Sequence, residues 1–271
     1  MTSIQKIIKY FSLAFAAFLI VSITYGIMMV LYSLAGPLGL NKLDDTTNKN
    51  DLVCDVSEID SIKIDIDKSD LDIKMDSKFK IEANNDNVVC KVSNNKLVIK
   101  EKSKVFFKSP QKVIIYLPYN INYREIEIET DAGSVNIDDI TAMKLDLELG
   151  AGKNVIKNIN VYDASIETGA GELKIEDGNI NNLELDMGAG KIDITSKLSG
   201  ISKIETGAGY LKLNLIGKVD DYKLKVETGI GRTRVSGDTI KSNEIIGSGH
   251  SFVTIESGIG EVDINYIDKN R

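Results

Sequence analysis

The sequence has little of the material from which catalytic and metal sites are built. It contains one histidine, two cysteines, three prolines and no tryptophan among 271 residues. The lone histidine, His250, has no cysteine near it and cannot supply the clustered ligands of a zinc site. Glycine, in contrast, is frequent at 22 residues. Frequent glycine with scarce proline favours repeated tight corners. We therefore expect neither a catalytic nor a metal site.

The longest apolar run lies at the N-terminus, where residues 10–41 carry no charge. About 20 apolar residues, at roughly 1.5 Å each, cross the hydrocarbon core of a bilayer as a helix. Residues 11–33 therefore predict one transmembrane signal-anchor helix. Lys6 and Lys9 precede it without any acidic residue, which places the N-terminus in the cytoplasm and the remaining chain outside the cell. The alternative is a cleaved signal peptide, because Ser33–Ala35 resembles a cleavage site.

The chain beyond this helix is acidic. The whole chain has a formal net charge of −7 and its first 41 residues carry two lysines and no acids, so the exported part carries −7 − 2 = −9. Such a domain favours cationic partners and divalent ions over nucleic acid. The Gly-Ala-Gly-Lys segments ending at Lys153 and Lys191 lack the longer pattern of a phosphate-binding loop. We expect no nucleic-acid or nucleotide binding and no cofactor, with Ca²⁺ left open.

The two cysteines are Cys54 and Cys90. In an oxidising compartment they would form one disulfide. In a reducing compartment they would be two small buried thiols, and the sequence alone leaves both alternatives open.

A Gly-x-Gly corner recurs along the second half of the chain. Four copies begin at Gly150, Gly169, Gly188 and Gly207, at a constant spacing of nineteen. Two later copies are more widely spaced, and the gap before the last one holds an insertion around residues 246–250. The corner glycines are Gly133, Gly150, Gly152, Gly169, Gly171, Gly188, Gly190, Gly207, Gly209, Gly229, Gly231, Gly258 and Gly260.

Each corner is flanked by apolar residues at every second position, which predicts strands with one buried face. Nineteen residues are too few for a strand–helix–strand unit. We therefore predict an all-β fold, a β-solenoid with about 19 residues per coil, in which coils stack about 4.8 Å apart. Ile128, Leu147, Ile166 and Leu185 should then lie above one another. The Ala or Ile between the glycines is expected to point into the stack, and an antiparallel sandwich is the alternative.

The predicted organisation follows from these patterns. Residues 1–10 are a short cytoplasmic segment and residues 34–54 a spacer. Residues 55–120 form an N-terminal cap with irregular β coils, and residues 121–271 form the regular solenoid. The C-terminal residues Tyr266–Arg271 are expected to protect its far end, because an open end exposes apolar core and unpaired strand edges.

One column of the repeat stands out, because the residue two before each corner is acidic. We predict an outward ladder of carboxylates about 5 Å apart, where each neighbouring pair costs about 0.8 kcal/mol before screening. The ladder would bind Ca²⁺ or a cationic polymer, be neutralised by nearby basic residues, or serve solubility. Its members are Glu129, Glu148, Glu167, Asp186, Glu205, Glu227 and Glu256, and the nearby basic residues are Lys144, Lys153, Lys191, Lys203, Lys225 and Arg232.

With these features the chain resembles the bacterial putative-adhesin family of β-strand-repeat domains. The resemblance covers residues 55–267 and is carried by the strand ending in Leu-Pro within Lys112–Thr130 and by repeats of the kind at Thr168–Ile175. It implies a repetitive β fold and an envelope location, and supplies no catalytic or ligand residues.

The function expected from these features is a non-enzymatic, membrane-anchored envelope protein that presents a rigid repetitive surface to wall polymer, another cell surface or an envelope protein. The alternatives are an accessory component of an envelope-stress response and a polysaccharide-active enzyme on a β-helix.

Overall fold

The computed structural model describes residues 50–52, 59–84, 87–101, 111–119 and 121–268. The predicted transmembrane helix at residues 11–33 and Cys54 lie outside these ranges. Within them, no helix has the length and apolar character needed to cross a bilayer. Cys90 is disulfide-bonded.

The described chain is built from strands, with one short 3-10 turn at Val219–Asp221. The strands are β1 (Asn50–Leu52), β2 (Ser61–Ile66), β3 (Asp70–Asp76), β4 (Lys80–Ala83), β5 (Val88–Ser93), β6 (Lys96–Glu101), β7 (Lys112–Pro118), β8 (Tyr123–Ala132), β9 (Val135–Ile137), β10 (Ile140–Ile156), β11 (Ile159–Ile175), β12 (Gly178–Leu198), β13 (Ile201–Ile216), β14 (Tyr222–Val235), β15 (Asp238–Ile240), β16 (Glu244–Ile246) and β17 (Ser251–Ile267).

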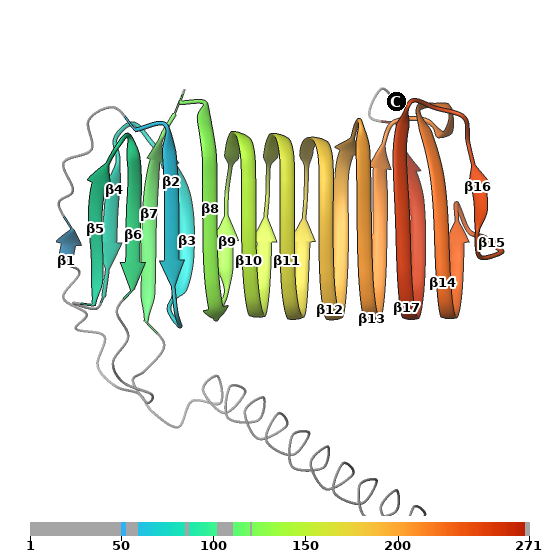
Figure 1. Ribbon diagram of the computed structural model, residues 1–271, viewed down its shortest axis with the longest axis horizontal. Helices are drawn as coiled ribbons and strands as arrows, with labels where there is room; N and C mark the ends of the chain where they lie inside the picture. Colours follow the sequence, from blue (N-terminus) through green and yellow to red (C-terminus); the bar gives the residue numbers. More distant parts are fainter. Residues whose placement is uncertain (1–49, 53–58, 85–86, 102–110, 120, 269–271) are drawn as a thin grey trace, which may run out of the picture. The chain divides into compact units, whose positions relative to one another are not determined.

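Strands β10 to β14 and β17 each pass through one Gly-x-Gly corner, so that each forms both arms of a coil (Figure 1). Strands β10, β11, β12 and β13 pair in parallel, with each residue beside its counterpart in the next repeat. Ile128 lies opposite Leu147, Leu147 opposite Ile166 and Ile166 opposite Leu185. The stacked-coil prediction is confirmed in this respect, and the antiparallel sandwich is wrong.

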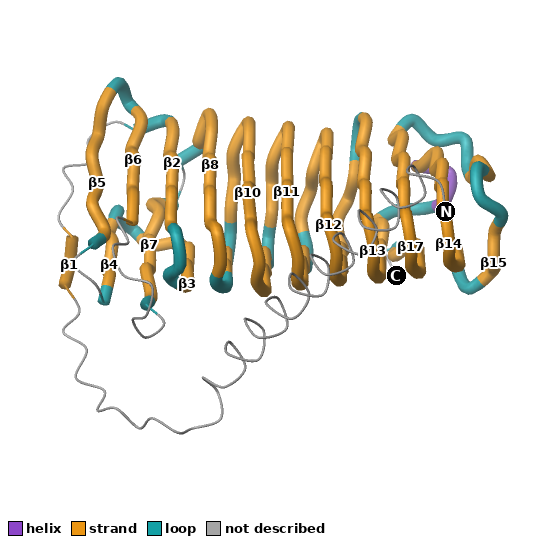
Figure 2. The backbone as a smooth tube through the Cα atoms, turned by 60° about the horizontal axis from the view of Figure 1, so that its bottom comes forward, coloured by secondary structure: helices purple, strands orange, loops and turns teal. Residues whose placement is uncertain are grey.

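The coils do not follow chain order at the C-terminal end. Strand β17 lies between β13 and β14 and pairs in parallel with both (Figure 2). The end of the stack is instead covered by β15 and β16, which pair antiparallel with β14. The prediction that the tail from Tyr266 caps this end is therefore wrong for Tyr266 and Ile267, which belong to β17. Residues 269–271 lie outside the described residues.

The N-terminal end of the domain repeats this arrangement. Strands β2 and β3 form a coil that lies between the β6–β7 coil and the β8–β9 coil. Antiparallel strands flank the outermost coil, with β5 beside β6 and β4 beside β7, while β1 pairs with β4. At each end of the stack, the second coil from the end is therefore one that is not adjacent in the sequence to both of its neighbours: the β2–β3 coil at one end and β17 at the other.

The core consists of aliphatic columns that run through the stack. One column contains Ile99, Ile64, Ile128, Leu147, Ile166, Leu185, Ile204, Ile255 and Val226, all of which are fully buried. A buried aliphatic side chain of this size contributes about 1.5–3 kcal/mol. Because the columns pass through every coil, this burial holds the coils together.

The corners differ from the prediction. The residue between the two glycines is exposed in each complete corner, and Ile230 and Ile259 are 70% and 57% exposed. The expectation that these side chains enter the stack is wrong, because the chain changes direction at the corner and turns this position outward. Gly171 shows why glycine is needed here: its φ is +128°, and a Cβ on it would lie 2.0 Å from the carbonyl oxygen of Gly152 in the neighbouring coil.

Candidate functional site

The seven predicted carboxylates lie in one straight row along the outside of the stack. Parallel pairing places Glu148 between Glu129 and Glu167, and Asp186 between Glu167 and Glu205. Because β17 is inserted, Glu256 follows Glu205 and Glu227 comes last. The register adds Asp65 of β2 as an eighth member beside Glu129. We call these eight residues the acidic row: Asp65, Glu129, Glu148, Glu167, Asp186, Glu205, Glu256 and Glu227.

Basic side chains neutralise only part of the row. Lys100 pairs with Asp65 at 2.6 Å and Lys63 with Glu129 at 3.5 Å. A hydrogen bond to Glu127 raises the pKa of Lys63, which therefore stays charged beside the row. Towards the other end, Lys203 pairs with Glu205 and Lys225 with Glu227, as predicted.

The centre of the row is not neutralised. Within the described chain, three adjacent members accept no hydrogen bond and form no ion pair: Glu148, Glu167 and Asp186. Glu256, nearer the end, forms none either, but Glu227 and Glu256 together raise the pKa of Lys225. Three of the basic residues expected to pair with the row point elsewhere: Lys144 pairs with Glu125 and Asp146, and Lys153 and Lys191 both pair with Glu172. Local neutralisation is thus wrong for this part of the row.

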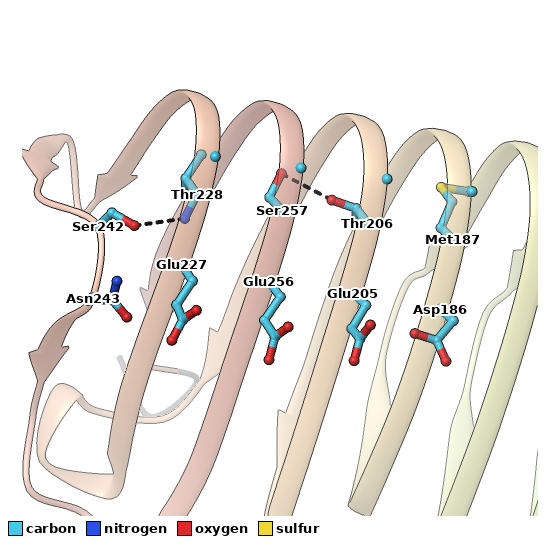
Figure 3. Close-up of a pocket in the computed structure, with 14 residues that line it drawn as sticks. Asp186, Met187, Glu205, Thr206, Glu227, Thr228, Ser242, Asn243, Glu256 and Ser257 are labelled. Carbon is cyan, nitrogen blue, oxygen red and sulfur yellow. Dashed lines mark hydrogen bonds between the residues drawn. The ribbon is translucent and has the colours of Figure 1, made fainter.

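Two hollows run beside the row, one of about 400 Å³ along Glu129 to Asp186 and one of about 710 Å³ along Asp186 to Glu227. Asp186 and Gly188 line both hollows, so that the two adjoin along the row, and we refer to them together as the groove. Figure 3 shows the carboxylates of Asp186, Glu205, Glu256 and Glu227 side by side on consecutive coils. The first glycine of each corner lines the other side of the groove.

A loop from beyond β15 closes the far end of this groove. The Thr228 N–H donates to Ser242 Oγ at 3.0 Å, and the Asn243 N–H donates to the Val226 carbonyl at 2.8 Å. These groups occupy the place that a further coil would take. Asn243 stands beside Glu227 in Figure 3, so the row ends at a neutral side chain.

The opposite face of the stack carries charges of alternating sign. Glu172 lies between Lys153 at 3.3 Å and Lys191 at 3.4 Å on the neighbouring coils. Burial raises the pKa of Glu172, but the two lysines outweigh this effect and hold the pKa below its ordinary value. Arg234 likewise pairs with Glu261 and Asp263. The same repeat therefore neutralises one face through alternation and leaves the acidic row uniform.

Groups suited to metal chemistry are lacking in the ranges that the structure describes: no cluster of three or more His, Cys, Asp or Glu side chains could hold a metal ion. The acidic row offers its carboxylates along a line, whereas Ca²⁺ is surrounded by six to eight oxygens. The two Gly-Ala-Gly-Lys segments are corners within β10 and β12 and are followed by strand, not by the helix of a phosphate-binding loop.

The fold and its repeat agree with a known family. The model of the Toastrack DUF4097 family matches residues 50–245, which is more than half of the chain. The chain belongs to this family. Among curated proteins none matches the sequence.

Three solved structures of other proteins are similar to this chain over almost their whole length. One is a putative cell adhesion protein from Clostridium sporogenes, with 17% identity over 81% of this chain and 99% of that one and a TM-score of 0.41. A putative lipid binding protein from Parabacteroides distasonis has 13% identity, coverage of 83% and 99%, and a TM-score of 0.46. A putative adhesin from Parabacteroides merdae has 12% identity, coverage of 81% and 95%, and a TM-score of 0.47.

Sequence reasoning missed Asp65 because no Gly-x-Gly corner follows it. A signal was present, since Asp65 follows Ile64 within Ile-Asp-Ile just as Glu129 follows Ile128 at the end of Ile-Glu-Ile-Glu. Alternation alone, aligned on the buried isoleucines, would have found it.

Proposed function

We propose that this chain is a non-enzymatic binding module of the cell envelope, and that the acidic row takes up an extended polymer bearing repeated cationic groups. One observation carries the proposal: Glu148, Glu167 and Asp186 stand on consecutive coils in one register, beside a groove, with no basic partner among the described residues. Stacked like charges oppose stability, so their presence is explained by a partner that neutralises them.

A polymer fits this geometry better than a single ion. The carboxylates repeat at the coil spacing of about 4.8 Å, so a partner that spans several coils meets one negative charge per coil. An isolated cation meets only two neighbours on the line. Solubility alone would be served equally by the alternating charges of the opposite face, where Glu172 is flanked by Lys153 and Lys191.

The location belongs to the same proposal. We infer a single-pass protein of the cell membrane, anchored by residues 11–33, with its N-terminus in the cytoplasm and the β domain outside. The support is the uncharged run at residues 10–41 with Lys6 and Lys9 before it. Protease added to intact cells should degrade the β domain, and protection of this domain until the membrane is opened would contradict the inferred orientation.

Binding to a defined cationic polymer tests the function. The probe is a fluorescent, fully deacetylated chitosan oligosaccharide, which carries one amine on every sugar, and its anisotropy is measured with the full-length protein in detergent. The row variant is Glu148→Gln/Glu167→Gln/Asp186→Asn. The matched control is Glu172→Gln/Glu184→Gln/Asp193→Asn, which removes the same net charge from strands β11 and β12 outside the row.

The row variant should lose at least tenfold in affinity and the control should lose little. Equal losses in both variants would reduce the effect to net charge and refute a role of the row. Unchanged binding by the row variant would refute it as well. If millimolar Ca²⁺ raises the melting temperature of the natural protein and not that of the row variant, the row binds this ion and the polymer proposal is replaced.

A further inference from the structure

The coil formed by β17 is bonded from both sides at one carboxylate. Tyr210 of β13 donates its hydroxyl to Asp263 Oδ2 at 2.8 Å. From the other side, Arg234 of β14 donates from Nε to Asp263 Oδ1 at 2.6 Å and from Nη2 to Oδ2 at 3.2 Å. Asp263 therefore joins three coils, of which β17 comes last in the chain and lies in the middle in space.

The connection from β13 to β14 crosses this inserted coil. Gly217, at its start, donates its N–H to the carbonyl of Ile267, the last residue of β17. The end of this connection, at the start of β14, contacts the segment that leads into β17: the Gly249 N–H donates to the Tyr222 carbonyl at 3.0 Å. A Cβ on Gly249 would lie 2.0 Å from the carbonyl carbon of Asp221, so the two segments lie directly against one another.

The N-terminal end of the domain repeats these contacts. Asp72 of the inserted β2–β3 coil accepts a hydrogen bond from Asn136 of β9 at 3.1 Å and pairs with Lys112 of β7 at 2.8 Å. The connection from β7 to β8 also crosses the inserted coil. There the Tyr119 N–H donates to the Asp76 carbonyl, and the Arg124 N–H to the Asp60 carbonyl.

We propose that these two arrangements are clasps that prevent the stack from unravelling coil by coil from either end. We call Asp263 with Tyr210 and Arg234 the C-terminal clasp. In repeat proteins the terminal repeats have one neighbour and open first. Here the coil nearest each end of the described chain has two neighbours, so pulling on it must break two sets of strand pairings at once. The inference goes beyond the proposed binding function and makes the module suited to holding a partner under tension.

A cut in the chain tests the C-terminal clasp. A protease site is inserted after Gly237, at the tip between β14 and β15, where a Cβ would meet no atom within 4 Å. Cleavage of the folded full-length protein makes residues 238–271 a separate fragment that contains β17. A fluorescent synthetic peptide of the same sequence is then added in excess, and its incorporation is followed on a sizing column.

The fragment should stay bound after cleavage and exchange over hours. Asp263→Asn should speed the exchange about tenfold, because it weakens charge-assisted hydrogen bonds. The matched control is Asp193→Asn. Asp193, on β12, lies in the same outward column as Asp263 but has no hydrogen bond or ion pair to a described residue. Exchange within the mixing time, or equal acceleration by both substitutions, would overturn the proposal.

Pulling the uncut chain by its two ends provides a second measurement, which needs no substitution. A clasped stack should unfold in one event. Stepwise lengthening, in which one coil after another is released, would show that the ends unravel and would refute the clasps even if Asp263→Asn fails to fold.

Discussion

Neutralising one carboxylate at the centre of the acidic row should stabilise the protein. Glu167 lies between Glu148 and Asp186, none of which has a basic partner in the described chain. Each neighbour at about 4.8 Å contributes about 0.8 kcal/mol of repulsion in water. At physiological ionic strength the Debye length of about 8 Å reduces this by nearly half. Glu167→Gln should therefore gain about 1 kcal/mol.

The matched control lies five residues away in the same strand. Glu172 stands between Lys153 and Lys191, so Glu172→Gln removes favourable contacts and should cost up to about 1 kcal/mol. The two substitutions have the same chemistry and opposite expected signs. For a domain of this size, 1 kcal/mol corresponds to about 2–4 °C in melting temperature.

Thermal unfolding of the full-length protein in detergent, followed by circular dichroism, measures both changes. The gain from Glu167→Gln should shrink in 1 M salt, where the Debye length is about 3 Å. A melting temperature that falls with Glu167→Gln would refute the reasoning, because it would mean that the carboxylate contributes to stability and needs no partner to explain it.

Four further predictions follow from local geometry and are read as shifts in unfolding midpoint. Gly171→Ala should cost about 3 kcal/mol, because its φ is positive and the added Cβ would meet the Gly152 carbonyl. Gly237→Ala should cost about 1 kcal/mol, because its φ of +90° is also positive but the added Cβ would meet no atom. Equal losses would contradict the role of the close approach. Ser202→Ala should stabilise by up to about 1 kcal/mol, since the buried Ser202 hydroxyl has no hydrogen-bond partner in the described structure; a lower midpoint would reveal a missed partner. Ser236→Asn should stabilise by about 0.5 kcal/mol, because Ser236 has φ of 52° in the two-residue turn before Gly237 and Asn-Gly is favoured there; no gain would exclude this turn as a source of strain. The hydrogen bond from Arg234 lowers the pKa of Asp263 in the folded protein. The stability that Asp263 contributes is therefore complete above its unfolded pKa of about 3.9 and is lost as the pH falls through its folded pKa. Asp263→Asn should flatten the acid side of the plot of stability against pH, and an unchanged plot would contradict the pairing.

The repeat made most of the core predictable. Because coils of equal length stack in register, residues one repeat apart had to share a column, and Leu147, Ile166 and Leu185 do. The outward corner was also readable. In the repeat around Ala189 the apolar positions are odd-numbered from Leu183 to Met187 and even-numbered at Ile192 and Ile194, so the alternation must change phase at the corner, which turns Ala189 outward.

The order of the coils could not be predicted in the same way. Each coil presents nearly the same aliphatic column and the same acidic residue to its neighbours, so pairing energies scarcely distinguish one neighbour from another. The specificity comes from single contacts such as Asp263 with Tyr210 and Arg234. In the sequence these residues are indistinguishable from other charged positions on the outer faces.

The acidic row and the clasps are physically connected. Eight carboxylates in register form seven neighbouring pairs, which at about 0.8 kcal/mol each amount to about 6 kcal/mol before screening and ion pairing. That is comparable to the whole stability of a typical domain. This repulsion acts along the stacking direction, so it would first separate a coil that has a neighbour on one side only. The outermost coils of the stack, β6–β7 and β14, are flanked by antiparallel strands, and Lys100, Lys225 and the neutral Asn243 lower the repulsion where the row ends. The β2–β3 coil and β17, which lie nearest the chain ends, are second layers with two neighbours each. A uniform row of charge can thus persist because the ends, where it would do most damage, are the places where the chain is fastened and the charge is compensated.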